Sequence, residues 1–161
     1  MALPLSLCAL LLAAPSARAA DSLGIFAGWA AFRDGREGRC YAIAEPQRGT
    51  AGATAKAYAT IGHWPERGVR GQLYLRLSRP QARDSRVYLS IGERRFALVS
   101  GQGQAWAQDA AMDRAILAAM RDASTMSVEG KGVNGRAFYD LYVLKGAATA
   151  MDAAALGCAR R

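Results

Sequence analysis

Histidine is nearly absent from the sequence, since His63 is the only one in 161 residues. No GxSxG or HExxH motif and no Cys–His pair accompanies it, so the usual signatures of serine hydrolases, zinc peptidases and cysteine peptidases are missing. The carboxylates are scattered, and no second positioned acid completes the pair that a glycosidase needs. We therefore expect His63 to be a turn histidine with ordinary hydrogen bonds, and we expect the protein not to be an enzyme.

Cofactor and metal patterns are missing as well. The segment from Gly101 to Gln104 is rich in glycine but lacks the GK[ST] ending of a phosphate-binding loop. It is better explained as a connector between a strand and a helix. Two cysteines and one distant histidine make a poor ligand set for zinc. The sequence predicts neither a cofactor nor a metal site.

Long apolar runs are confined to the first nineteen residues. The apolar stretch from Leu5 to Ala14 is followed by Pro15 and Ala17-Arg18-Ala19, which is the pattern of a secretory signal peptide. The stretch is too short to span a bilayer, and the alternative is a buried N-terminal helix. We expect cleavage of residues 1–19 near Ala19, which leaves one exported domain over residues 20–161 and no transmembrane segment.

Cysteine is scarce, and the exported domain keeps only Cys40 and Cys158. An even number of cysteines in an oxidising compartment predicts a disulfide, here between the second strand and the C-terminus. A metal-binding pair or a reactive thiol are the alternatives. A closed loop of this length stabilises a fold by about 4–5 kcal/mol in the chain-entropy model.

Lysine is also scarce, so arginine supplies most of the basic residues. The formal net charge is +8, which favours contact with anionic surfaces. For an exported protein these are lipid headgroups, lipopolysaccharide or polyanionic glycans, in the periplasm or at the envelope. A protein partner is the alternative, and nucleic acid is not expected.

Strand periodicity is the clearest pattern that the sequence does contain. Residues 72–78, 86–91 and 94–99 alternate apolar and polar positions, as half-buried antiparallel strands do. We expect a three-stranded meander in which Leu75 pairs with Leu89 and Leu89 pairs with Phe96, the second turn being Gly92-Glu93. Further strands are expected at residues 25–32, 39–44, 57–65, 124–130 and 137–146, the last two joined by a hairpin loop at Asn134-Gly135.

Two segments have helical spacing. Residues 109–124 form one expected helix with Asp109 as its N-cap, and residues 147–156 form the other, with Gly157 as its C′ residue. About seven strands with one helix before the last hairpin and one at the C-terminus predict a mainly β fold. It is expected to be a β-sandwich or a curved antiparallel sheet rather than a parallel α/β fold.

One face of the expected meander is basic and aromatic. Tyr74, Arg76 and Tyr88 are expected to point outward, with Arg76 facing Tyr88. Tyrosine and arginine are common at binding hot spots, and arginine binds phosphate and carboxylate through two hydrogen bonds. The alternative is a solvated strand face with an internal cation–π pair. The arginines expected nearby are Arg67, Arg70, Arg79, Arg83 and Arg86.

Three other side chains lead to definite expectations. Trp29 and Trp106 are expected in the core. Asp140 lies in a segment that is apolar on both sides, so we expect it to be a hydrogen-bonded structural carboxylate, or one paired to an arginine. A site combining His63 and Asp140 would require both to lie in one cleft.

The order of the motifs resembles the invasion-associated locus B family of exported alphaproteobacterial proteins. The resemblance covers the mature chain through GIFAGWAAF, RCYAIAEP, YATIGHWP, DAAMDRAILAAMRDASTMSVEG and FYDLYVLKGAATAMDAAALGC. It implies a periplasmic or envelope protein with a β-rich fold, an association with host-cell invasion in one lineage, and no established enzyme activity. It transfers no catalytic residues. Family members often carry a further cysteine near the first tryptophan, and Trp29 is instead followed by AAFRD.

Two classes of function are therefore weighed. The first is a non-catalytic binding or accessory protein at the cell envelope or host surface, in which the basic Tyr/Arg face makes the contact or net charge alone attracts a polyanion. The second is a periplasmic hydrolase or enzyme inhibitor with its site near His63.

Overall fold

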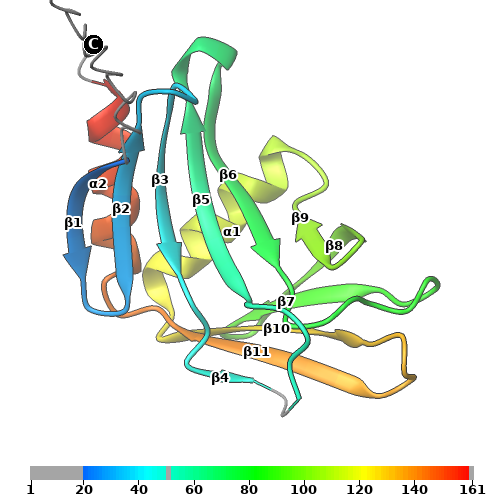
Figure 1. Ribbon diagram of the computed structural model, residues 1–161. Coiled ribbons are helices and arrows are strands. Elements are labelled where there is room, and N and C mark those ends of the chain that lie inside the picture. The colour runs from blue at the N-terminus through cyan, green and yellow to red at the C-terminus, as the bar shows by residue number, and fades with distance from the viewer. Residues whose placement is uncertain (1–19, 50–51, 160–161) are drawn as a thin grey trace, which may run out of the picture.

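A computed structural model describes residues 20–49 and 52–159. The expected signal peptide lies outside the described residues. The described chain forms one eleven-stranded antiparallel sheet and two α-helices, in the strand order β1-β2-β3-β5-β6-β9-β8-β7-β10-β11-β4 (Figure 1). The strands are β1 (Asp21–Phe26), β2 (Trp29–Asp34), β3 (Arg39–Ala44), β4 (Arg48–Gly49), β5 (Tyr58–Trp64), β6 (Val69–Arg76), β7 (Val87–Ile91), β8 (Arg94–Gly101), β9 (Gln104–Trp106), β10 (Thr125–Lys131) and β11 (Ala137–Val143). The helices are the 3₁₀-helix η1 (Pro65–Arg67) and the α-helices α1 (Ala110–Asp122) and α2 (Ala147–Ala159).

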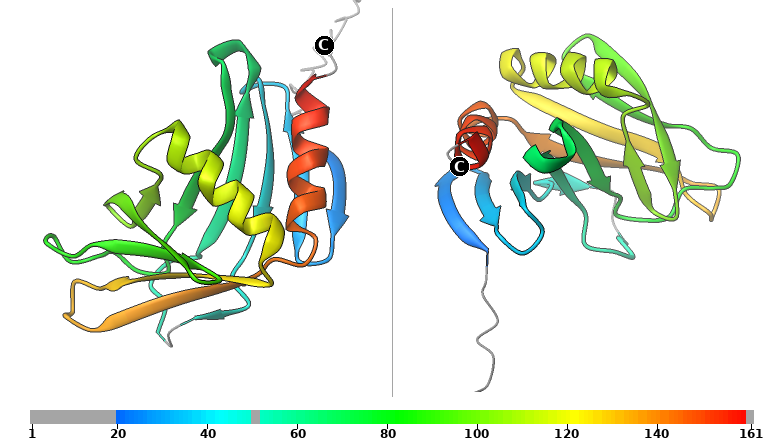
Figure 2. Two further views of the ribbon diagram at one scale, coloured as in Figure 1. Left: turned by 180° about the vertical axis from the view of Figure 1, so that it is seen from behind. Right: turned by 90° about the horizontal axis from the view of Figure 1, so that it is seen from above.

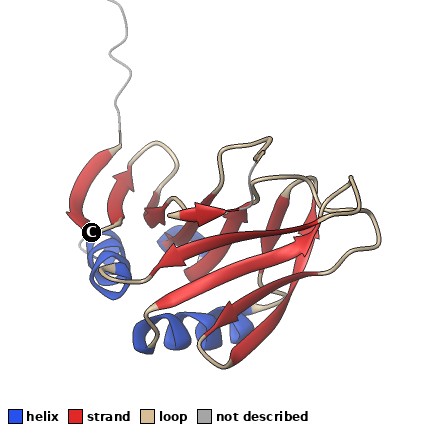
Figure 3. Ribbon diagram, turned by 90° about the horizontal axis from the view of Figure 1, so that it is seen from below, coloured by secondary structure: helices blue, strands red, loops and turns tan. Residues whose placement is uncertain are grey.

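The sheet bends strongly between its two ends. Strands β2, β3, β5 and β6 run across the direction of β7, β10 and β11, and both α-helices lie on the same side of the first group (Figures 1 and 2). The view from below shows α1 alongside the second group of strands (Figure 3). This confirms the expected mainly β fold in its curved-sheet form, with one helix before the last hairpin and one at the C-terminus. The sheet is continuous and has eleven strands, so the sandwich and the count of about seven were wrong.

The core forms where the alternating strands meet the helices. Leu73 and Leu75 of β6, and Leu89 of β7, are fully buried, as their period-two spacing predicts. Helix α1 adds Ile116 and Met120 to the same cluster. Its first turn is capped as expected, because the carboxylate of Asp109 accepts a hydrogen bond from the backbone N–H of Met112 at 2.8 Å.

One expected strand pairing was wrong and one was right, and one expected strand is in fact two. The residues at 25–32 form parts of two strands, because Ala27 and Gly28 turn the chain between β1 and β2. Strand β6 pairs with β5 and β9, not with β7, so Leu75 lies opposite Ala59 and Ala105 rather than Leu89. The short strands β4 and β9 were not expected at all. The β7–β8 hairpin has the predicted register.

One expectation about a side chain and one about a helix end also need correction. Trp106 is 36% exposed on β9 and does not fill the core. Helix α2 continues through Gly157 to Ala159, so Gly157 does not end it. Trp29, by contrast, is buried as expected, and its indole N–H donates a hydrogen bond to the carbonyl of Val143 at 2.9 Å, which ties β2 to the end of β11.

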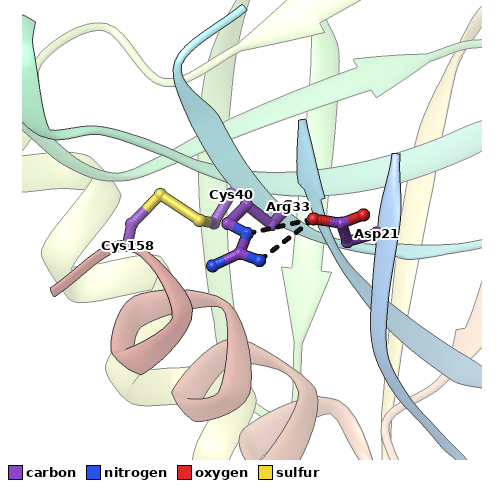
Figure 4. Close-up of a disulfide and its surroundings, with 4 residues drawn as sticks. All are labelled: Asp21, Arg33, Cys40 and Cys158. Atoms are coloured by element: carbon purple, nitrogen blue, oxygen red, sulfur yellow. Dashed lines mark hydrogen bonds and ion pairs between the residues drawn. A yellow bond between two sulfur atoms is a disulfide. The ribbon is translucent and has the colours of Figure 1, made fainter. Parts of the chain in front are cut away.

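The predicted disulfide between Cys40 and Cys158 is present and joins β3 to the last turn of α2 (Figure 4). Both cysteines are buried in a small cluster with Ala31 and Ala154. A disulfide of this kind is typical of proteins from oxidising compartments. No helix in residues 20–49 and 52–159 is long and apolar enough to cross a membrane.

Candidate functional site

The residues of the predicted Tyr/Arg surface do not form one patch. Tyr74 and Arg76 lie on β6, where Tyr74 is opposite Thr60 and Trp106. Tyr88 lies on β7, and both β9 and β8 separate the two strands. The expected contact of Arg76 with Tyr88 is therefore wrong, because the register that predicted it does not form.

The arginines expected around this surface are dispersed. Arg67 lies on η1, beside the β2–β3 turn. Arg70 is exposed on β6, opposite His63 on β5. Arg79 is only 8% exposed and belongs to the interior rather than to a solvated face. Only Arg86, which directly precedes β7, lies close to Tyr88.

Tyr88 instead belongs to a groove on the outer face of β7, β8, β10 and β11. Side chains on this face alternate with the buried positions, so the register places Ala97, Tyr88, Glu129 and Tyr139 in one row across the four strands. The volume of the groove is about 640 Å³. We call it the Tyr88 groove, and it is lined by Ser85, Arg86, Tyr88, Arg95, Glu129, Gly130, Lys131, Ala137, Phe138 and Tyr139.

The guanidinium of Arg95 lies over the aromatic ring of Tyr88. The guanidinium carbon of Arg95 lies 4.0 Å from the ring centroid of Tyr88, which is a cation–π contact. The same guanidinium lies 3.8 Å from the carboxylate of Glu129, and both side chains are substantially exposed. Such an ion pair is worth at most about 1 kcal/mol. An incoming anion can therefore take the place of Glu129 at little cost.

The groove carries more positive than negative charge. Arg86, Arg95 and Lys131 contribute three cations against the single carboxylate of Glu129. Tyr139 is exposed and lies in the same row as Tyr88, so aromatic surface lies beside the cations, whereas Phe138 is buried. This combination suits an anionic ligand that also carries apolar or ring-shaped parts.

His63 and Asp140 do not share a cleft. His63 lines a different pocket of about 390 Å³, together with Arg70, Cys158 and residues of α2, and none of the described residues that line it carries a carboxylate. Burial lowers the pKa of His63, and the charge of Arg70 lowers it further. Cys158 is held in the disulfide and provides no thiol nucleophile. The described residues of this pocket therefore include neither an acid nor a nucleophile beside His63.

Metal chemistry has no evident place in the described part of the chain. Among residues 20–49 and 52–159, no three histidine, cysteine or acidic side chains gather closely enough to hold a metal ion.

Comparisons with protein-family models, with curated proteins and with solved structures found no match to this chain.

Most residues of the Tyr88 groove, including all those on β10 and β11, were not identified from the sequence. Arg95, Glu129 and Tyr139 come from three strands, and helix α1 separates β8 from β10 in the chain. The alternation in AFYDLYV indicates that Tyr139 faces away from the core, but nothing local indicates that β10 pairs with β7. The expected meander therefore lacked β10 and β11, the two strands that complete the groove beside β7.

Proposed function

We propose that the protein is an exported, non-catalytic binding or accessory factor of the cell envelope. The leader-like N-terminal sequence supports export, and so does the disulfide of Cys40 with Cys158. The motif order that resembles the invasion-associated locus B family favours the same periplasmic or envelope location. A role at a host surface is the extension that this resemblance implies.

The Tyr88 groove carries this proposal. Its three cations and one carboxylate attract an anionic component of the envelope, and its aromatic wall gives that component a surface to stack on. Arginine can bind a phosphate or carboxylate through two parallel hydrogen bonds. The partner is thus an anionic lipid headgroup, lipopolysaccharide or an acidic glycan, all of which present phosphate or carboxylate groups.

The test compares two double variants that change the same residue types on different strands. Tyr88→Ala/Arg95→Ala removes the stacked pair of the groove, and Tyr74→Ala/Arg76→Ala removes a tyrosine and an arginine of β6. Binding is measured by co-sedimentation with anionic vesicles, by titration with lipopolysaccharide and by retention on an acidic glycan matrix. The groove variant should bind one of these at least about tenfold more weakly, which corresponds to about 1.4 kcal/mol, while the β6 variant binds normally.

Two results would contradict the proposal. Equal weakening by both variants would show that net charge alone drives binding, and unchanged binding by both would remove the groove from consideration. Thermal melting of each variant checks that the fold is intact. Binding by the groove should also weaken as salt increases, because exposed charges are screened over about 8 Å at physiological ionic strength.

A further inference from the structure

Asp140 is a charged side chain in the interior of the protein. It lies at the centre of β11 with 0% exposure, and its side chain faces inward like those of Phe138 and Tyr142. One carboxylate oxygen, Oδ2, accepts a hydrogen bond from the backbone N–H of Ser78 at 3.0 Å. Nothing within the described residues donates a hydrogen bond to the other oxygen, Oδ1. Among the described residues, the expected structural carboxylate therefore accepts a hydrogen bond through only one of its two oxygens.

Two hydroxyl groups near Asp140 have the same property. Ser78 and Tyr142 are buried, and neither hydroxyl has a hydrogen-bond partner within the described residues. Burial raises the pKa of Tyr142, and the charges of Asp140 and Glu45 raise it further, so its hydroxyl keeps its proton. Each of these three buried oxygens lowers the stability of the fold unless another group forms a hydrogen bond with it.

A pocket of about 380 Å³ leads to this cluster. Ser78 and Asp140 line its buried end, while Glu45, Arg48 and Lys56 line its exposed part. Lys56 and Glu45 form an ion pair at 2.7 Å, and both side chains are largely exposed. The ion pair therefore stabilises the exposed part of the pocket only weakly. The volume lies at the low end of the range for ligand pockets, which limits the ligand to a small molecule or headgroup.

Strand β4 brings the backbone close to this carboxylate. A Cβ atom on Gly49 would lie 3.2 Å from Oδ1 of Asp140 and 3.3 Å from the carbonyl oxygen of Tyr139. Glycine at this position places no side chain against Oδ1, which is already buried. An alanine there would place a methyl group against the oxygen without removing its charge, which provides a steric variant to test the pocket.

We propose that this pocket binds a small zwitterion, whose ammonium group meets Asp140 and whose anionic group lies between Arg48 and Lys56. An ammonium carries three N–H donors and no acceptor, so it can donate to Oδ1 of Asp140 and to the hydroxyl oxygen of Ser78, which both belong to residues that line the pocket. Its charge also compensates that of the buried carboxylate. The anionic group is expected at the exposed part because both described cations of the pocket lie there. Amino acids and phosphoethanolamine headgroups share this chemistry.

Calorimetric titration of the protein with glycine and with phosphoethanolamine tests the proposal and separates its two sources. Acetate and inorganic phosphate lack the ammonium, and ethanolamine lacks the anion. Either zwitterion should bind at least about tenfold more tightly than all three control compounds. Equal binding of ethanolamine would overturn the role of Arg48 and Lys56, and no binding by either zwitterion would overturn the site.

Three variants locate the binding. Asp140→Asn keeps an oxygen for the N–H of Ser78 but removes the charge, and it should weaken binding at least tenfold. Gly49→Ala keeps the charge and should weaken binding by covering Oδ1, which serves if Asp140→Asn does not fold. Tyr88→Ala/Arg95→Ala should leave the titration unchanged, because that groove lies on the opposite face of β11. Binding that survives both Asp140→Asn and Gly49→Ala would place the zwitterion elsewhere and refute the proposal.

Discussion

Cys40 and Cys158 form a disulfide across 118 positions of the sequence, and the bond fastens the last turn of α2 to β3. The other buried residues of its cluster, Ala31 and Ala154, are small, and the larger Leu23 and Phe26 pack against the cluster while only partly buried. Small side chains bury little apolar surface, so packing alone holds this end of the helix weakly. The disulfide therefore contributes more than apolar packing does to the attachment of the last turn of α2.

Removal of the disulfide should lower the free energy of unfolding substantially. In the chain-entropy model, a loop of this length is worth about 4–5 kcal/mol. We expect Cys40→Ala/Cys158→Ala, made in residues 20–161, to show this loss in urea unfolding followed by circular dichroism. A reducing agent should destabilise the wild-type domain to a similar degree and leave the variant unaffected. If the reductant shifts both proteins alike, the loss does not come from the disulfide.

The connection from β11 to α2 depends on Gly146. Its φ is +89°, and a Cβ atom there would overlap the backbone carbonyl oxygen of Phe26. Gly146→Ala should cost about 3 kcal/mol or more, because left-handed strain of about 1–2 kcal/mol adds to the displacement of the β1–β2 turn. Thermal and urea unfolding measure this loss.

Gly92 provides the matched control for that substitution. It also has a positive φ, +56°, but a Cβ atom there would meet nothing within 4 Å. Gly92→Ala should therefore cost only the backbone strain, about 1–2 kcal/mol. A loss in Gly146→Ala no greater than in Gly92→Ala would show that the contact with Phe26 is not decisive.

Local patterns in the sequence were sufficient for much of the fold. Alternation predicted the buried faces of β6, β7 and β8, and the Gly92-Glu93 turn predicted the β7–β8 register. The capping oxygen of Asp109 and the pairing of two cysteines were also predicted. Each of these depends on neighbours in the sequence or on a choice among very few partners.

The expected pairing that failed joined β6 to β7, and the pairings that were missed include that of β10 with β7, far apart in the chain, and those of the very short strands β4 and β9. Alternation fixes which face of β6 is buried, but Leu75 meets an apolar neighbour whether it pairs with Leu89 or with Ala59 and Ala105. The two-residue strand β4 and the three-residue strand β9 are too short to show a period. The Tyr88 groove and the pocket at Asp140 both depend on such pairings, so neither was visible in the sequence.

His63 should make the domain sensitive to mild acid. Burial and the charge of Arg70 lower its pKa below the usual 6.5, so the unfolded chain binds a proton more readily than the folded domain. Stability should therefore fall as the pH drops below about 6.5, until the lowered pKa of the folded state is reached. Urea unfolding between pH 5 and 8 measures the slope. His63→Gln should flatten it, and a slope that persists in this variant would assign the effect to other groups.

The pH dependence of stability that comes from Asp113 should have the opposite sign to that from His63. Its carboxylate accepts a hydrogen bond from the backbone N–H of Leu73 at 2.8 Å, which joins α1 to β6. Burial raises the pKa of Asp113 above 3.8; the hydrogen bond from Leu73 opposes this shift and the charge of Asp109 adds to it. The folded domain therefore holds this proton more tightly than the unfolded chain does.

The contribution of Asp113 to stability is accordingly greatest below the ordinary pKa of 3.8 and falls as the pH rises from there through the raised value. Asp113→Asn keeps an oxygen that can accept from Leu73 and removes the charge, so its stability should not show this fall. Urea unfolding at closely spaced pH values from 3 upward measures the difference from wild type. The exposed residue Asp84 supplies the control, because Asp84→Asn should follow the wild-type curve. If Asp113→Asn and wild type fall in parallel, the carboxylate at α1 is not the group that titrates.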